Sequence, residues 1–366
     1  MKGPDLFSIL KADFQERTRR SGFLITLFLA IYLGYAVNTG QILILLDTYR
    51  GIYNSAWVGS LMSLIITFFL GIFGFYLVKN AIQQDERTGV GQIIAATGIT
   101  RPQYLLGKWL SNFTILSSLV GILAAGALLM QLIQHEDARI QLWALAAPLL
   151  FIALPMMALV AALAVFFETV SWLKGGFGNL VYFFLFTFLL VVGVFLPQVP
   201  WLDVTGINLI GSSMKAAARA AFPAYDGMFT LAMIARTPVD TFAWSGLDWT
   251  AGLIFQRLGW VAVAAAVTLA GVPFFNRFDS TGYKASRMGK KADAELPVDV
   301  AASLPTGAPV RLTPAAPGRR FQPNFLRLVG LEFLLLVKGI KWYWYVGMAA
   351  IWLGCAVTPS TNMRPY

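Results

Sequence analysis

The stretch "VGSLMSLIITFFLGIFGFYLV" (Val58–Val78) decides the class of fold. It carries no charged side chain and reaches the roughly 20 apolar residues that a helix needs to cross a bilayer. The chain around it is similar, with 57% hydrophobic and 13% charged residues, whereas soluble domains carry about 25% charged residues. We therefore predict an all-α polytopic membrane protein.

Runs of the same kind recur along the chain and define the predicted spans. Each is predominantly apolar and is bounded by charged or turn-forming residues. The first six predict a six-span helical bundle over residues 1–275, and the seventh begins a separate unit. The predicted spans are Gly22–Val37, Val58–Val78, Leu110–Ile133, Leu142–Phe167, Leu180–Leu196, Leu258–Phe275 and Tyr343–Val357.

The basic residues predict the orientation. If the N-terminus is cytoplasmic, most of the 28 Lys and Arg residues lie in cytoplasmic segments, as the positive-inside rule requires. The polar loop 80–108 is then cytoplasmic, and the long loop 197–256 is external, with a short helix near Ser212–Ala221. We expect a multi-pass protein of the bacterial inner-membrane type. The same rule explains the net charge of +10 without a nucleic-acid partner.

Two segments follow the predicted bundle. Residues 276–324 are basic, rich in Pro and Ala and without an apolar period, which predicts a disordered cytoplasmic linker. Residues 325–366 repeat the layout of the N-terminus, since the amphipathic stretches Leu6–Arg20 and Leu326–Lys341 each precede a basic turn and an apolar span. Both stretches predict helices in the membrane plane. Because a single span makes an incomplete repeat, we expect a longer chain whose second repeat is cut off here.

A polar, glycine-containing segment separates the second and third spans: "DERTGVGQIIAATGITRPQYLLGKW" (Asp85–Trp109). The acidic pair Asp85 and Glu86 is favourable where a helix begins, because of the helix dipole. Gln92–Ala96 can form a helix that presents its two isoleucines to a neighbour. By its residues alone, the segment is equally a helix-turn feature held beneath the membrane or an ordinary connecting loop.

The second half of this segment has the residues that end one helix and begin another. Gly98 suits a left-handed cap at a helix C-terminus. Thr100 can then cap a new helix, with Pro102 in the first turn, where its missing N–H group costs nothing. Lys108 is expected at the membrane boundary, where its long side chain reaches the polar surface.

The segment resembles the pattern E-x-x-x-G-x-x-x-x-L-x-x-T-P-x-S-R-x-x-Y-L-x-G-K of the ABC-2-type permease subunits of ABC transporters. Asp85, Ile94, Gly98 and Thr100 stand where the family has Glu, Leu, Pro and Ser. The stretches "YRGIYNSAWVGSL" and "FETVSWLKGGFGN" are also similar to one branch of the family, so the resemblance covers residues 5–275. The residues identical to the pattern are Gly89, Thr97, Arg101, Tyr104, Leu105, Gly107 and Lys108.

The resemblance implies a function. In that family the loop between the second and third spans is a coupling helix that docks in a groove of a separate ATP-binding subunit. It therefore implies the permease subunit of an ATP-driven exporter, not an enzyme, working with a second permease copy or half. ATP and Mg²⁺ would belong to the partner, with no cofactor or metal on this chain. The docking segment would be Arg87–Arg101. The implied coupling residues are Gly89, Ile93, Ile94, Thr97, Gly98 and Arg101, followed by the motif residues Tyr104, Leu105, Gly107 and Lys108. To these we add Glu86 and Arg87, as the exposed charges nearest the proposed contact.

Absences in the sequence favour a separate motor. A Walker A motif is missing, because Gly107 and Lys108 are followed by Trp and lack the preceding glycine. Charged residues do not lie well inside any predicted span, whereas proton- or sodium-coupled transporters keep such groups there. The spans instead carry hydroxyl groups, such as Ser60, Ser63 and Thr67, which suit helix packing or an amphipathic cargo.

Two other classes stay open: a membrane-embedded enzyme and a non-transporting membrane assembly factor. The single His and single Cys argue against a Cys/His metal site, and Glu168 is expected in an ion pair with Lys174 near the membrane surface. An assembly factor would need no ATPase partner. The remaining acid–base or metal candidates are His135, Glu136, Asp137, Asp226, Asp240 and Asp248.

Overall fold

In the computed structural model the chain divides into two units, Met1–Lys291 and Ala292–Tyr366. The structure describes residues 16, 18, 21–39, 41–96, 98–134, 136–137, 139–195, 199–225, 227, 229–233 and 240–275, all in the first unit. The predicted linker 276–324, the predicted second unit 325–366 and nearly all of the predicted helix Leu6–Arg20 lie outside these residues.

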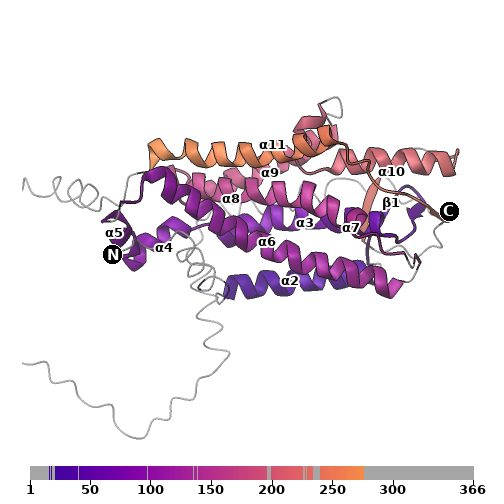
Figure 1. The fold of residues 1–366 in the computed structure, drawn as a ribbon, viewed down its shortest axis with the longest axis horizontal. Coiled ribbons are helices and arrows are strands. Elements are labelled where there is room, and N and C mark those ends of the chain that lie inside the picture. Colours follow the sequence, from indigo (N-terminus) through magenta and orange to yellow (C-terminus); the bar gives the residue numbers. More distant parts are fainter. Residues whose placement is uncertain are drawn as a thin grey trace, which may run out of the picture. The chain divides into compact units, whose positions relative to one another are not determined.

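Helices make up most of the described part of the chain (Figure 1). A π-helix, η1 (Leu149–Ala153), and two 3₁₀ turns, η2 (Pro200–Leu202) and η3 (Val272–Phe274), interrupt or end them. The α-helices are α2 (Ser21–Asn38), α3 (Ser55–Val78), α4 (Ala81–Thr88), α5 (Val90–Ala95), α6 (Arg101–Gln134), α7 (Leu142–Pro148), α8 (Leu154–Thr169), α9 (Gly176–Phe195), α10 (Ile207–Ala221) and α11 (Ala251–Ala270).

Five helical stretches among the described residues are long and apolar enough to cross a bilayer. A sixth apolar helix, Gly22–Val37, coincides with the first predicted span and is shorter. This content supports the prediction of a helical membrane protein, while the seventh predicted span lies outside the part of the chain described. The five long stretches are Ser55–Thr88, Arg101–Ile133, Leu142–Thr169, Gly176–Phe195 and Ala251–Phe274.

Helix α3, which contains the fold-deciding run, is buried along nearly its whole length. It packs against α2, α6, α7 and α8, and α8 in turn packs against α6 and α11. Figure 1 shows α2, α3, α6, α8 and α11 running alongside one another. Asn54 fixes the start of α3, because its side-chain oxygen accepts a hydrogen bond from the Trp57 backbone N–H at 2.8 Å. The centre of the core is therefore the helix with the most continuous apolar sequence.

The fourth predicted span is not one regular helix. Its residues form α7, the π-helix η1 and α8 in succession. Pro148 ends α7, because proline has no N–H to donate and its ring crowds the preceding turn. The Pro148 carbonyl accepts a hydrogen bond from the buried Ser63 hydroxyl of α3 at 2.9 Å. The break is thus held in place by the central helix.

Close approaches between helices depend on glycine. A Cβ atom at Gly59 of α3 would collide with the backbone carbonyl of Leu145 in α7. A Cβ atom at Gly71 would collide with the Phe186 ring of α9, and the Tyr182 hydroxyl donates a hydrogen bond to the Gly71 carbonyl. Small residues at such contacts let helix backbones approach closely, as is common in membranes.

A buried charged pair joins α11 to the segment before α10. Because α11 begins at Ala251 rather than at the predicted Leu258, Arg257 falls inside it and is 2% exposed. Its guanidinium donates to the Asp203 carbonyl and lies 3.9 Å from the Asp203 carboxylate. That carboxylate also accepts from the Leu209 backbone N–H at 2.9 Å, near the start of α10. Part of the predicted external loop is therefore buried.

Two small sheets, which the all-α prediction did not include, lie near the start of α3. The Phe242 and Trp244 rings meet Trp57 edge-on at centroid distances of 5.9 and 6.1 Å, so the strands close over that end of α3. We call it the strand end, and the opposite end the α4–α5 end (Figure 1). Strand β1 (Ile42–Leu45) pairs antiparallel with β3 (Thr230–Met233), and β2 (Tyr49–Gly51) pairs parallel with β4 (Asp240–Phe242).

An ion pair fastens β2 to the segment after α6. The Arg50 guanidinium donates to both carboxylate oxygens of Glu136 at 2.9 and 2.6 Å, and the Tyr53 backbone N–H donates to the same carboxylate at 2.9 Å. Burial raises the pKa of Glu136, but the hydrogen bonds from Arg50 and Tyr53 outweigh it, so the pKa lies below its usual value. Glu136 is thus engaged in structure, and its neighbour His135 lies outside the described residues.

Replacing Gly59 by Ala should separate α7 from α3 and destabilise the protein. Overpacking of this kind costs about 1–3 kcal/mol. Gly121→Ala in α6 is the matched control, because a Cβ atom there meets nothing within 4 Å. Thermal unfolding in lipid nanodiscs should show a lowered Tm for Gly59→Ala and an unchanged or raised Tm for Gly121→Ala. Equal stabilities would contradict the close backbone contact.

The Arg50–Glu136 pair should make stability depend on pH. Because the pKa of Glu136 is lowered on folding, the pair stabilises the protein above the ordinary carboxylate pKa of about 4.3 and loses this effect as pH falls through the lowered value. The side chains are 21% and 28% exposed, so we expect at most about 1 kcal/mol. The Tm difference between wild type and Glu136→Gln should be present at neutral pH and vanish in acid; a constant difference would refute it.

Candidate functional site: the α4–α5 end

The polar segment between α3 and α6 forms two short helices joined by a glycine. Asn80 adopts a left-handed backbone conformation (φ 73°) and turns the chain from α3 into α4. Gly89 (φ 75°) turns it again between α4 and α5. Asparagine and glycine are the residues that reach this conformation most readily. Of the two structures that the sequence left open, the segment forms the helix-turn one, and its left-handed glycine is Gly89 and not the predicted Gly98.

A buried carboxylate from another helix caps α4. Glu168, at the end of α8, is 3% exposed. Its carboxylate accepts hydrogen bonds from the backbone N–H groups of Ala81, Ile82 and Gln83 at 2.9, 2.7 and 3.1 Å. These are donors that a helix start leaves unsatisfied, and a negative charge there is favourable. The Lys174 ammonium, which we had expected beside Glu168, lies 3.8 Å from the Glu86 carboxylate.

The acidic pair of the segment lies within α4 and not at its start, contrary to prediction. Asp85 is 7% exposed and accepts a hydrogen bond from the Tyr104 hydroxyl at 2.7 Å. The Lys108 ammonium lies 2.9 Å from the same carboxylate. Lys108 is itself buried and does not reach toward the surface as expected. Both partners project from α6, so Asp85 binds α4 to α6 through a buried ion pair.

An apolar cluster fills the space beneath the two short helices. Tyr104 stacks on Phe275, which follows α11, at a centroid distance of 5.2 Å. Ile94 of α5 packs against this cluster. Four helices and the end of α11 therefore share one apolar contact region at this end. The buried members are Ile82, Tyr104, Leu105, Val165 and Phe275.

The outer surface of α4 and α5 combines charge with an exposed isoleucine. Ile93 is 69% exposed, whereas its neighbour Ile94 faces the apolar cluster. Glu86 and Arg87 are exposed on α4, and the Glu86 carboxylate lies 3.8 Å from the Lys174 ammonium. An exposed ion pair of that length contributes little to stability. We call the surface formed by Glu86, Arg87 and Ile93 the α4–α5 face.

The structure divides the predicted site residues into two groups. Exposed on α4, α5 or the turns that follow are Glu86, Arg87, Ile93, Gly98 and the first residue of α6, Arg101. The second group has structural contacts, since Gly89 forms the turn and Ile94, Tyr104, Leu105 and Lys108 pack beneath the face. Gly107 is partly buried in α6, and Thr97 lies outside the described residues.

Helix α6 begins as predicted. Thr100 precedes its first residue, and the Thr100 backbone N–H donates to the Gln103 side-chain oxygen at 2.9 Å, which is one half of a capping box. This bond fixes where the exposed turn after α5 becomes a long helix. The helix start was predicted from Thr100 and Pro102, whereas the contact with Gln103 was not.

Sequence reasoning missed the two contacts that hold the site together. Glu168 lies more than 80 residues from the amides that it caps, and the Asp85–Lys108 pair also joins two separate helices. Their only signal was the presence of ionisable residues beside apolar spans. Among the described residues, groups of three or more His, Cys, Asp or Glu side chains that could hold a metal ion do not occur.

Replacing Glu168 by Gln should loosen the start of α4. The amide removes the charge and one acceptor, at a cost of about 1–3 kcal/mol, so hydrogen exchange at Ala81–Gln83 should accelerate by roughly one to two orders of magnitude. Mass spectrometry on nanodisc-embedded protein can measure it. Glu86→Gln is the control, because that carboxylate is exposed on the same helix. Unchanged protection in Glu168→Gln would contradict the cap.

Comparison with known proteins adds no relative. Protein-family models, curated proteins and solved structures all fail to match this chain. The role of the α4–α5 end therefore rests on its own residues. They form an exposed, mixed apolar and charged face that buried contacts fix to α6, α8 and the end of α11.

Proposed function

We propose that this chain is the membrane-spanning permease subunit of an ATP-driven transporter, and that a separate ATP-binding subunit docks on the α4–α5 face. One observation carries the proposal: this short exposed face is anchored to two long helices by the buried Glu168 cap and the buried Asp85–Lys108 pair. Connecting loops need no such anchorage. The resemblance of the same segment to ABC-2-type permeases supports the same reading.

The anchorage suits the transmission of movement. A displacement of α4 acts on α8 through the backbone bonds to Glu168, and on α6 through Asp85. Breaking either contact would remove hydrogen bonds from a buried carboxylate, and breaking a buried ion pair costs about 3–5 kcal/mol. The helices therefore move with α4 and not past it. In the proposed mechanism, closure of two ATPase subunits pushes on α4–α5 and shifts the long helices between inward- and outward-open states.

Two of the residues weighed as enzyme groups have other partners. The Glu168 carboxylate accepts from three backbone amides, and Glu136 binds Arg50. Each is held by its contacts rather than directed toward a substrate. These contacts favour the permease over the membrane-embedded enzyme. ATP and Mg²⁺ would be used by the partner subunit, and the resemblance favours export.

Ile93→Asp should abolish docking. It places a charge where the proposed groove is apolar, and losing the burial of one isoleucine alone removes about 1.5–3 kcal/mol, so at least a tenfold loss of co-purification is expected. The native membranes would be solubilised, labelled with a photoreactive azido-ATP and purified through this chain. A labelled protein with a Walker A motif should appear with wild type.

Ile140→Asp is the matched control, because Ile140 is an exposed isoleucine at the strand end. It should retain the labelled partner, which separates loss of docking from a general effect of an added charge. The proposal fails if wild type brings down no labelled protein, or if Ile93→Asp retains as much of it as Ile140→Asp.

A further inference from the structure

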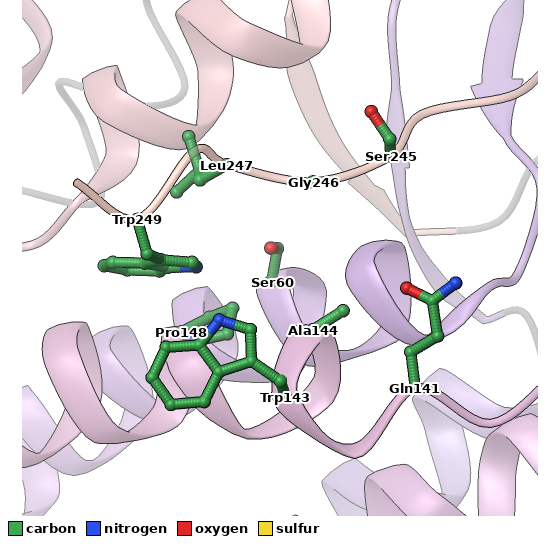
Figure 2. A pocket seen from close by; sticks show the side chains of 9 residues that line it. All are labelled: Ser60, Gln141, Trp143, Ala144, Pro148, Ser245, Gly246, Leu247 and Trp249. Carbon is green, nitrogen blue, oxygen red and sulfur yellow. The ribbon is translucent and has the colours of Figure 1, made fainter.

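A small cavity opens at the strand end, away from the α4–α5 face. Its volume is about 160 Å³, and it lies between α3, α7 and the segment that joins β4 to α11. Figure 2 shows the Ser60 hydroxyl directed toward the 245–249 segment, with the indoles of Trp143 and Trp249 on one side and Gln141 on the other. Helices and a loop distant in sequence therefore contribute polar and aromatic groups to one space.

Backbone irregularities shape this cavity. Gly246 has a φ of 100°, and a Cβ atom there would lie 2.9 Å from the Ala56 side chain, so only glycine fits the turn that forms one wall. Pro148 forms another wall and leads into the π-helix η1. Such π-helical turns inside α-helices are frequent at functional sites. The left-handed turn at Gly246 and the π-helix after Pro148 thus bound the cavity, and ordinary helix packing requires neither of them.

The Ser60 hydroxyl is the unusual group in this cavity. Ser60 is 1% exposed, and its Oγ atom has no hydrogen-bond partner among the described residues. Ser63, on the same face of α3, is equally buried but donates to the Pro148 carbonyl at 2.9 Å. Leaving a buried hydroxyl unsatisfied costs about 1–3 kcal/mol, and native proteins rarely do so. A polar atom of a bound ligand placed opposite Ser60 would satisfy this hydroxyl.

The lining restricts the chemistry of that ligand. None of the side chains around the cavity is ionisable, and burying a charge without a counter-charge is costly, so the bound group is uncharged. The two indoles offer apolar faces for a flat or ring-shaped surface. A cavity of roughly 150 Å³ holds one benzene-sized molecule. The ligand group is thus about as large as one six-membered ring.

We propose that this cavity binds an uncharged, hydroxyl-bearing group about the size of one six-membered ring, which hydrogen-bonds to Ser60 and packs against Trp143 and Trp249. Such a group occurs either on a free molecule in water or as the head group of a membrane amphiphile. Tryptophan side chains favour the head-group level of a bilayer, and Trp143 is 57% exposed. The site is independent of docking at the α4–α5 face.

The test uses the full chain in phosphatidylcholine nanodiscs and two neutral probes. Methyl β-glucoside represents a free ligand and octyl β-glucoside, below its micellar concentration, represents an amphiphile head group. Tryptophan fluorescence should change saturably with at least one of them. Binding of both indicates a free or lipid-linked ligand, and binding of the octyl form alone indicates the head group. Octyl sulfate and octyltrimethylammonium, which carry charges, should not compete.

Ser60→Ala should weaken binding of the probe about five- to tenfold, the value of one hydrogen bond, without lowering the Tm. Ser63→Ala is the matched control on the same helix face, and it should lower the Tm while leaving the affinity unchanged. Trp249→Ala should remove most of the fluorescence change. The proposal is overturned if neither probe binds, if the charged amphiphiles compete as well as the neutral one, or if Ser60→Ala binds as tightly as wild type.

Discussion

Carboxylates that accept hydrogen bonds from backbone amides hold this structure together at its helix ends. A helix leaves its first N–H groups unsatisfied, and in an apolar environment each unsatisfied group costs several kcal/mol. Glu168 serves the first turn of α4, Asp203 serves α10, and Glu136 serves the turn before α3. Two of these carboxylates also meet an arginine. The breaks between helices are therefore as specifically determined as the helices themselves.

These contacts also join helices that are far apart in the sequence. Glu168 belongs to α8 and caps α4, so the end of one long helix and the start of one short helix form a single mechanical unit. Asp85 adds α6 to it through Lys108 and Tyr104. The exposed Ile93 lies on this unit and not on a loop. In the proposed permease, a partner bound there would act directly on α6 and α8.

Much of the helical architecture could be predicted from the sequence. Apolar runs located the long helices, because a bilayer requires about 20 such residues in succession, and Thr100 with Pro102 located the start of α6. A left-handed glycine turn was predicted, but it was placed at Gly98 and not at Gly89. The two positions look alike in the sequence, because each glycine follows residues able to form a helix. The left-handed turn lies at Gly89, where α4 must change direction after Asp85 has been buried.

What the sequence could not reveal depends on contacts between distant residues. Nothing near Glu168 indicates that the amides of α4 will meet it, and Arg257 was placed outside a span because the helix begins earlier than its apolar run. Ser60 and Ser63 cannot be told apart from the sequence, yet Ser63 donates a hydrogen bond to Pro148 and Ser60 faces a cavity. Periodicity identifies the face of a helix but not the partner across from it.

The π-helix η1 has a consequence for any residue-by-residue scan of this region. A π turn accommodates one residue more than an α turn for each hydrogen-bonded loop, so the regular 3.6-residue count is interrupted between α7 and α8. A helical wheel drawn straight through Leu142–Thr169 would assign the residues after Ala153 to the wrong side. Cysteine-accessibility or alanine scans should therefore be analysed as two wheels, with the count restarted at Leu154.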